Sequence, residues 1–195
     1  MFSILLREMQ NLEVGGEYIG IDIFSGEGVD YVLDLATADF EKLKDWKGKF
    51  NTIHVHYVME HVKDIFTMVR NIDYITAEGG VVCFSAPFIW RLHRIPVDMW
   101  RYTPQSVDYL FKNFHFDPNL SSWSTRKNLI TTLDKFPELD LGSGLGKENF
   151  LLKIMIKLFR KLKIDNNYFS ERALMYETNL MMIGIKRSSE VYTFL

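Results

Sequence analysis

The feature of the sequence that most constrains its fold is a buried strand that runs directly into a helix and is followed by a second buried strand. Residues 50–57 form an apolar run that ends in polar and aromatic side chains, and residues 63–75 have apolar side chains at helical spacing. Gly79 and Gly80 end the helix, and residues 81–84 form the second apolar run. Two strands separated by a helix predict a right-handed crossover and parallel pairing. We therefore expect an open α/β sheet, whose ligand sites lie at the carboxyl ends of its strands.

The remaining segments extend this alternation in both directions. The chain opens with a predicted helix over residues 3–12, which Ser3 caps and which ends before Gly15 and Gly16. Further strands are predicted over residues 18–23, 31–33 and 179–186 and within 116–130, and helices over 37–49, 104–114 and 150–163. We expect a mostly parallel sheet with helices on both faces. It forms one domain over residues 1–195, with a helical insertion at about 134–175 before the last strand.

Charge, cysteine content and hydropathy exclude several classes of protein. Lys and Arg number 23 against 25 Asp and Glu, and a net charge of -2 gives no field that would attract nucleic acid. Cys83 is the only cysteine, which excludes a disulfide framework and a cysteine zinc site and favours the cytoplasm. No apolar run reaches the ~18 residues of a membrane span, and residues 1–6 are too short for a signal sequence. We expect a soluble cytoplasmic protein.

Two acidic residues follow successive predicted strands. Asp22 is the one charge in the apolar run 18–23, and Asp34 comes just after the run 31–33. A carboxylate at the carboxyl end of a strand in an open α/β sheet can accept hydrogen bonds from both ribose hydroxyls, a geometry that serves NAD and S-adenosylmethionine alike. The alternatives are a surface acid that caps a loop for Asp22 and a helix-cap acid for Asp34.

Five short stretches occur in a defined order along residues 18–114. They are Tyr-Ile-Gly-Ile-Asp ending at Asp22, Val-Leu-Asp-Leu ending at Leu35, Met-Glu-His-Val beginning at Met59, Glu-Gly-Gly ending at Gly80, and Met-Trp-Arg-Tyr-Thr-Pro ending at Pro104. In this order the first four resemble the later motifs of class I S-adenosylmethionine-dependent methyltransferases. The last stretch, with the residues from Pro87 before it, is similar to a branch of small methyltransferase-domain proteins often found beside saccharide genes.

The resemblance implies a Rossmann-like methyltransferase fold. Its cofactor would be S-adenosyl-L-methionine, and its acceptor a small molecule or a saccharide. By the same resemblance Asp22 would bind the ribose, Asp34 and Leu35 the adenine, and His56 and Tyr57 would line the cofactor cleft.

The sequence departs from the family in two places. The family's first strand lies in the middle of its sheet, and this strand and its glycine-rich loop should precede Tyr18, where no such segment occurs. Gly26 and Gly28 come after the ribose strand and open no helix, so they are no substitute. This departure predicts an N-terminally incomplete fold. Asn51 stands where the family usually has aspartate. Asparagine can still form hydrogen bonds but lacks the negative charge.

Glu60 and His61 stand at a predicted strand-to-helix junction that points toward the cleft. They fit an acid–base pair that binds substrate, because histidine titrates near neutrality, or a helix start with an acid that favours its dipole and a packed imidazole. His54 and His56 share one strand face and resemble a metal pair. Since no carboxylate or cysteine stands at ligand spacing from them, we predict no metal site.

The loop 88–103 holds the densest cluster of polar and aromatic residues. In one interpretation His93 is the general base that removes an acceptor proton and Asp98 orients it. Trp100 and Arg101 would then bind substrate, with Arg101 as a clamp for a phosphate or carboxylate. In the other interpretation Arg101 pairs with Asp98 at a structural corner and Trp100 packs into the core. The sequence leaves both interpretations open.

These observations predict an enzyme that transfers a methyl group by in-line displacement, mainly by positioning the acceptor next to the sulfonium. The alternative is a non-catalytic, truncated or degenerate methyltransferase-like binding domain. A nicotinamide-dependent oxidoreductase is disfavoured, because its glycine fingerprint is also missing. The helix 150–163 has a basic face that could contact an anionic membrane, or it packs as a lid on its own domain. Nothing in the sequence indicates an oligomeric state.

Overall fold

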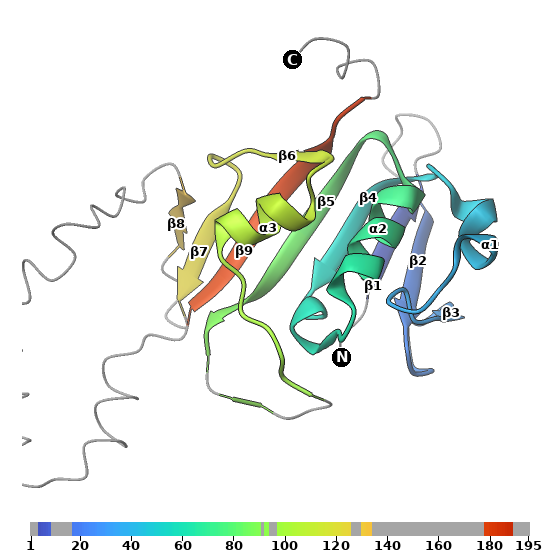
Figure 1. Cartoon of the computed structure of the whole chain (residues 1–195), viewed down its shortest axis with the longest axis horizontal. Helices are drawn as coiled ribbons and strands as arrows, with labels where there is room; N and C mark the ends of the chain where they lie inside the picture. The colour runs from blue at the N-terminus through green and yellow to red at the C-terminus, as the bar shows by residue number, and fades with distance from the viewer. Residues whose placement is uncertain are drawn as a thin grey trace, which may run out of the picture.

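The computed structural model describes residues 4–8, 17–90, 92–93, 97–125, 130–133 and 178–188, which form a single sheet with short helices beside it (Figure 1). The strands are β1 (Ile4–Glu8), β2 (Glu17–Asp22), β3 (Tyr31–Val32), β4 (Phe50–His56), β5 (Thr76–Ile89), β6 (Phe114–Phe116), β7 (Ser122–Thr125), β8 (Ile130–Thr132) and β9 (Thr178–Lys186). The helices are α1 (Phe40–Leu43), α2 (Ile65–Ile75) and α3 (Pro104–Leu110), with 3₁₀ turns η1 (Lys44–Trp46) and η2 (Met59–His61). The strand order is β3-β2-β1-β4-β5-β9-β7-β8, and β6 pairs with β9.

The predicted strand–helix–strand unit is confirmed. β4 and β5 pair in parallel, and α2 lies between them in the chain. Asp64 caps α2, because its carboxylate accepts the backbone N–H of Thr67 at 2.9 Å. The apolar stripe of α2 is buried in one core with residues of β4 and β5: Ile53, Val55, Ile65, Met68, Val69, Ile72, Ile75, Val82 and Phe84. Burial of this stripe stabilises the helix more than its intrinsic propensity does.

The N-terminal segment contains a strand and not the predicted helix. β1 lies in the middle of the sheet and runs antiparallel to both β2 and β4. The apolar run 4–6 fits either structure, but as a strand its backbone has partners on both sides. Only residues 9–16 join β1 to β2, whereas a parallel crossover needs about a dozen residues or more. The short connection therefore permits an antiparallel pair, and a strand of reversed direction occupies the middle of the sheet.

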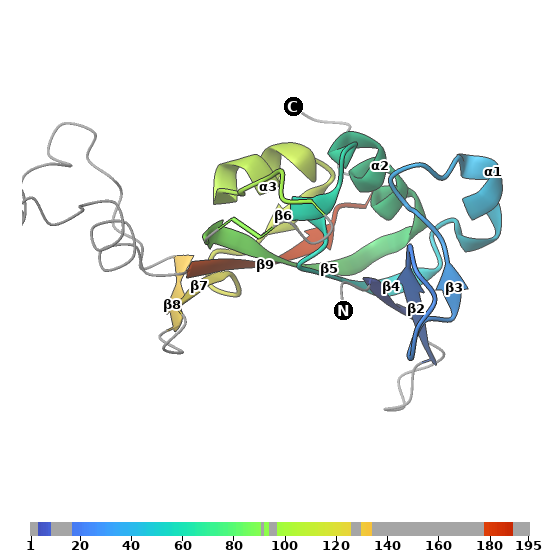
Figure 2. The same ribbon diagram turned by 90° about the horizontal axis from the view of Figure 1, so that it is seen from below.

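The sheet is mixed, which corrects the prediction of a mostly parallel one. β2 pairs with β3 and β4 with β5 in parallel, whereas β9 runs antiparallel to β5, β6 and β7. Residues 126–129 alone join β7 to β8, too few for a crossover, so this pair is antiparallel as well. The prediction of helices on both faces is also not met among the described residues, because α1, α2 and α3 all lie on one face (Figure 2).

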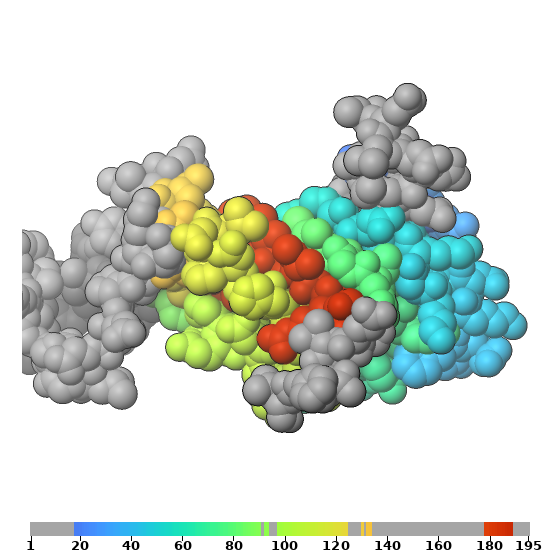
Figure 3. Space-filling model, turned by 90° about the horizontal axis from the view of Figure 1, so that it is seen from above, coloured from blue at the N-terminus to red at the C-terminus, as the bar shows by residue number. Residues whose placement is uncertain are grey.

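β9 connects two parts of the fold that are distant from it in sequence. It lies between β5 and β7, and β6 also pairs with it. Figure 3 shows its residues as a red band between the green and yellow parts of the surface. The predicted last strand is therefore confirmed, and it lies inside the sheet.

The start of α3 is as predicted. Pro104 is its first residue, and Thr103 caps it in a capping box with Ser106, whose N–H lies 3.2 Å from the Thr103 hydroxyl oxygen. The predicted insertion at 134–175, including the helix 150–163, lies outside the described residues. Of the helices in the described ranges, none has the length and apolar content to cross a membrane.

Candidate functional site

The carboxyl ends of β2, β3, β4 and β5 meet at one edge of the sheet, because all four strands run in the same direction (Figure 1). Asp22 is the last residue of β2, and Asp34 follows the end of β3. Asp22 Oδ1 accepts the backbone N–H of Phe24 at 3.0 Å, and Asp34 Oδ1 accepts that of Ala36 at 2.8 Å. Each acid holds its own turn through one oxygen. The other oxygen, Oδ2, has no hydrogen-bond partner in the described part of the chain.

The turn that follows β2 packs against Gly20 and so holds the end of that strand. The Asp30 carboxylate accepts the Gly20 N–H at 2.7 Å, and the Asp30 N–H donates to the Gly20 carbonyl at 2.8 Å. A Cβ at Gly20 would lie 1.8 Å from the Gly28 carbonyl oxygen, so glycine alone permits this approach. The glycines of this stretch build a turn beside Asp22.

A buried asparagine that the sequence analysis missed holds the loop after β3. The Asn71 side-chain amide donates to the carbonyls of Leu35 at 2.8 Å and Ala38 at 2.7 Å. Leu35 itself is 2% exposed and belongs to the core. The sequence did contain a signal for Asn71, because a polar residue stands on the apolar stripe of α2, three residues after Met68. A buried side-chain amide needs hydrogen-bond partners, so such a residue is expected to hold a neighbouring segment.

The residue that follows β4 adopts an uncommon backbone conformation. Tyr57 has a φ of 52°, a left-handed value that costs a residue with a side chain about 1 to 2 kcal/mol. Its N–H donates to the Ser85 carbonyl at 3.0 Å, and the chain then turns into η2. Burial, and secondarily the charge of Glu60, raises the pKa of Tyr57, so the phenol stays protonated at neutral pH.

His56 belongs to a hydrogen-bonded row of side chains. Its Nδ1 lies 2.7 Å from Ser85 Oγ, and its Nε2 lies 3.3 Å from His54 Nδ1. By strand alternation these histidines lie on the face opposite to the buried Ile53 and Val55. Burial lowers the pKa of His56, which favours the neutral imidazole. His56 therefore faces away from α2, whereas Tyr57 follows at the carboxyl edge.

The segment 97–103 packs onto η2 through backbone hydrogen bonds. The Glu60 carbonyl accepts the N–H of Met99 at 2.8 Å and that of Trp100 at 3.3 Å. The Trp100 indole N–H donates to the Val62 carbonyl at 2.7 Å, and the buried Tyr102 hydroxyl donates to the Met59 carbonyl at 2.9 Å. These contacts bring the loop after β5 against the loop after β4.

Glu60, His61 and His93 form a cluster where the two loops meet. The Glu60 side chain is buried, and its carboxylate oxygens accept no hydrogen bond from the described residues. His61 Nε2 lies 3.8 Å from Glu60 Oε1, and the His61 and His93 rings meet edge to face with centroids 5.1 Å apart. Burial raises the pKa of Glu60 to about 7, although its backbone N–H and Arg101 oppose the shift. Burial lowers the pKa of His61.

Asp98 connects His93 to Arg101. Arg101 donates to both carboxylate oxygens of Asp98, from Nη2 to Oδ2 at 2.7 Å and from Nη1 to Oδ1. The same Oδ2 accepts the His93 backbone N–H at 2.9 Å and lies 3.2 Å from His93 Nδ1. The hydrogen bonds from Arg101 lower the pKa of Asp98 to about 2. The structural interpretation requires an ion pair between Arg101 and Asp98, and the catalytic interpretation requires Asp98 to lie beside His93. Both contacts occur together in the structure.

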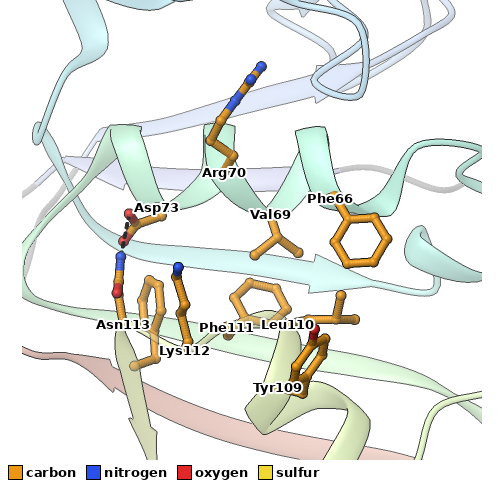
Figure 4. A pocket seen from close by; sticks show the side chains of 10 residues that line it. Phe66, Val69, Arg70, Asp73, Tyr109, Leu110, Phe111, Lys112 and Asn113 are labelled. Carbon is orange, nitrogen blue, oxygen red and sulfur yellow. Dashed lines mark hydrogen bonds between the residues drawn. The ribbon is translucent and has the colours of Figure 1, made fainter.

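A hollow of about 530 Å³ lies between α2 and the end of α3 (Figure 4). Its walls include the apolar side chains of Phe66 and Val69 and the Tyr109 ring. In the same wall the Asp73 carboxylate accepts a hydrogen bond from Asn113 at 3.0 Å. None of the predicted site residues lines this hollow, and no motif in the sequence indicated it.

No protein-family model and no curated protein sequence matches this chain. Among solved structures, an S-adenosylmethionine-dependent methyltransferase from Archaeoglobus fulgidus is similar, with 14% identity and a TM-score of 0.47 over 85% of this chain and 74% of the other. A phosphoethanolamine N-methyltransferase from Haemonchus contortus, in complex with phosphomonomethylethanolamine and S-adenosylhomocysteine, has 14% identity and a TM-score of 0.42 over 80% of this chain and 37% of the other. At such low TM-scores the function rests on this chain's own residues.

Proposed function

We propose that this protein binds S-adenosyl-L-methionine and transfers its methyl group to a small-molecule or saccharide-type acceptor in the cytoplasm. The observation on which the proposal rests is the position of Asp22 at the carboxyl end of β2, where Oδ2 has no partner among the described residues. A carboxylate in this position can accept hydrogen bonds from ribose hydroxyls. The ordered motifs over residues 18–114, which resemble those of class I methyltransferases, favour S-adenosylmethionine over NAD.

The residues at this edge fit the adenosine half of the cofactor. Asp22 would hold the ribose, and Asp34, which follows the neighbouring parallel strand, has an oxygen available for the adenine amino group. Asn71 holds the Asp34–Leu35 loop in place through the Leu35 carbonyl. Tyr57 and His56, at the end of β4, would border the cleft. These roles follow from polar groups that lie at the ends of parallel strands.

The methionine half of the cofactor has different surroundings from those in the family. β1 occupies the middle of the sheet but runs in the reverse direction, so its carboxyl end lies at the opposite edge. Among the described residues, β1 therefore contributes no carboxyl end to the edge at which Asp22 lies. This reversal favours a second candidate function, a non-catalytic methyltransferase-like domain that binds adenosine compounds without transferring a methyl group.

On the acceptor side, the chain's own residues would position the acceptor and take its proton. When bound, the cofactor supplies an electrophilic methyl group on a positively charged sulfur. His93 is the proposed proton acceptor, and Asp98 orients it and stays ionised at neutral pH. Arg101 is bound to Asp98, so in this proposal it positions that carboxylate. Its 28% exposed side chain is then only partly available to a charged acceptor.

His61 and Trp100 would form the wall against which the acceptor lies, with the Glu60 side chain buried behind it. Trp100 is fixed by its hydrogen bond to Val62, so it would offer its ring rather than its N–H. Glu60 is fully buried and would act on the acceptor only through its neighbours. The net charge of -2 gives the chain no field that would attract nucleic acid, which favours a neutral or singly charged acceptor.

Calorimetric titration of the whole chain with S-adenosylmethionine, S-adenosylhomocysteine and NAD tests this proposal. We expect the first two ligands to bind and NAD not to bind. No heat from either of the first two at about 1 mM ligand would contradict cofactor binding. Binding without methyl transfer to any acceptor in a panel of sugars and small hydroxy or amino compounds would favour the non-catalytic candidate.

A further inference from the structure

We propose that Glu60, His61 and His93 bind a divalent transition-metal ion, represented by Zn²⁺, where the loop after β4 meets the loop after β5. Each residue offers one ligand atom, and these atoms all lie within 4.8 Å of one another. Two nitrogens and one carboxylate are the ligand set of many catalytic zinc sites, which keep a further position open. The proposal concerns metal binding by the chain itself and does not depend on the methyl-transfer function.

The buried carboxylate of Glu60 is the first observation in its favour. The side chain is 1% exposed, and neither of its oxygens accepts a hydrogen bond within the described ranges. A charged carboxylate that is buried with so little compensation is costly, because it has lost its hydration. A divalent cation beside it would supply the missing interaction.

The second observation is the orientation of His61. Its Nδ1–H donates to the Val97 carbonyl, which fixes the proton on Nδ1 and leaves the lone pair on Nε2. This second nitrogen lies 3.8 Å from Glu60 Oε1. Two ligand atoms of a tetrahedral zinc site are roughly 3.3 Å apart, as follows from bonds of about 2.0 Å. A small rotation of either side chain would bring both atoms to one ion.

The third observation is the support around His93. Its ring lies edge to face against that of His61, and its Nδ1 lies 3.2 Å from the Asp98 carboxylate. Metal-binding histidines are commonly oriented by a carboxylate or a backbone carbonyl. Here the carboxylate of Asp98 would orient His93, and the carbonyl of Val97 would orient His61. Arg101 in turn donates hydrogen bonds to Asp98 and fixes its position. Both histidines of the cluster are therefore held by residues outside it.

The sequence-based prediction of no metal site considered only His54 and His56, which have no carboxylate or cysteine at ligand spacing. The proposed ligands come from two loops that lie 32 residues apart, at His61 and His93, and only the fold brings them together. If the methyl-transfer proposal also holds, a bound ion would change the chemistry at His93. A nitrogen that binds the ion cannot take the acceptor proton, and the ion would instead lower the pKa of a coordinated acceptor hydroxyl.

The test is calorimetric titration of the chelator-treated, untagged whole chain with ZnCl₂. We expect one ion per chain with a Kd of about 1 μM or tighter. Glu60→Gln and His93→Asn should each weaken binding by at least about 100-fold, since removal of a supporting residue alone costs 10- to 100-fold. His115→Ala and His54→Ala are the matched controls, and we expect changes below about threefold. The proposal would be overturned if the unaltered chain bound no zinc, or if Glu60→Gln and His93→Asn bound zinc as tightly as the unaltered chain does.

A second test uses Co²⁺ in place of Zn²⁺ with the unaltered protein, so its result does not depend on whether the variants fold. Co²⁺ in a site of two nitrogens and a carboxylate with low coordination number gives intense visible absorption, whereas Co²⁺ with six oxygen ligands absorbs weakly. We expect the intense spectrum, and Zn²⁺ should abolish it in a 1:1 titration. A weak, six-coordinate spectrum would overturn the proposal. Loss of zinc binding in His54→Ala but not in His93→Asn would do the same, because the site would then lie elsewhere.

Discussion

The guanidinium of Arg101 binds both oxygens of the Asp98 carboxylate, a side chain that is only 1% exposed. Asp98 also accepts the His93 N–H, so one carboxylate connects the two ends of the loop after β5. Such a bidentate pair fixes geometry as well as charge, because the planar guanidinium matches the carboxylate. The loop after β5 therefore depends on this pair for its shape.

Arg101→Ala should lower the free energy of unfolding by about 3 to 5 kcal/mol, since it removes the cation from the buried Asp98 carboxylate and leaves only His93 beside it. Arg101→Lys should cost less, because it keeps the charge and loses the second hydrogen bond. Urea unfolding of both variants measures the difference. If Arg101→Ala kept full stability and lost only acceptor use, Arg101 would be a substrate clamp and the structural interpretation would be wrong.

Asn71 provides a second stability prediction. Asn71→Ala removes the donors to the Leu35 and Ala38 carbonyls, and we expect a loss of about 2 to 4 kcal/mol because buried acceptors remain without partners. Asn51→Ala is the matched control, since the Asn51 side chain makes no hydrogen bond within the described residues. Thermal unfolding followed by circular dichroism compares the two. Equal melting temperatures for both variants would show that the Leu35 loop does not depend on Asn71.

Sequence patterns predicted the elements whose periodicity is unambiguous. β4, α2 and β9 are long enough to show alternation or a helical stripe, and they form as expected. The run 4–6 is too short to distinguish a helix from a strand by period. The length of the connection 9–16 indicates that β1 and β2 are antiparallel, because so short a connection permits no parallel crossover. The antiparallel β6, β7 and β8 are three or four residues long, and such strands have no clear pattern.

The candidate site was predictable where its residues follow strands and not where the fold joins distant loops. Asp22 and Asp34 lie at strand ends, as their positions in the sequence indicated. The cluster of Glu60, His61 and His93 depends instead on the hydrogen bonds that join the loop after β5 to the Glu60 carbonyl. Backbone contacts of this kind have no residue-type signature, so the sequence did not indicate them.

The proposed ribose contact predicts a binding effect. If S-adenosylhomocysteine binds, Asp22→Ala should weaken it by about 1.5 to 3 kcal/mol, the range for a hydrogen bond to a charged group. Glu27→Gln is the matched control, because it removes a charge from the exposed turn after β2 without touching Asp22. Calorimetry measures both variants. An unchanged affinity in Asp22→Ala would refute the ribose role, and an equal loss in Glu27→Gln would indicate a general effect of charge.

Glu60 predicts how the stability of the metal-free protein depends on pH. Burial raises the pKa of its carboxyl from 4.5 to about 7 in the folded chain. Between these values the unfolded chain has released this proton and the folded chain still holds it. The unfolded state then binds fewer protons, so the free energy of unfolding falls as the pH rises. The whole shift corresponds to about 3 kcal/mol, and the loss is complete slightly above pH 7.

Glu60→Gln isolates this effect, because the amide has nearly the same shape and does not ionise. In a chelating buffer, the variant should gain stability relative to the unaltered protein as the pH rises from about 4.5 to 7, by up to about 3 kcal/mol. Glu41→Gln is the control, since Glu41 is exposed and its pair with Lys44 contributes little. Urea unfolding at a series of pH values gives the curves. Parallel curves for Glu60→Gln and the unaltered protein would mean that Glu60 titrates in the folded chain as it does in the unfolded one.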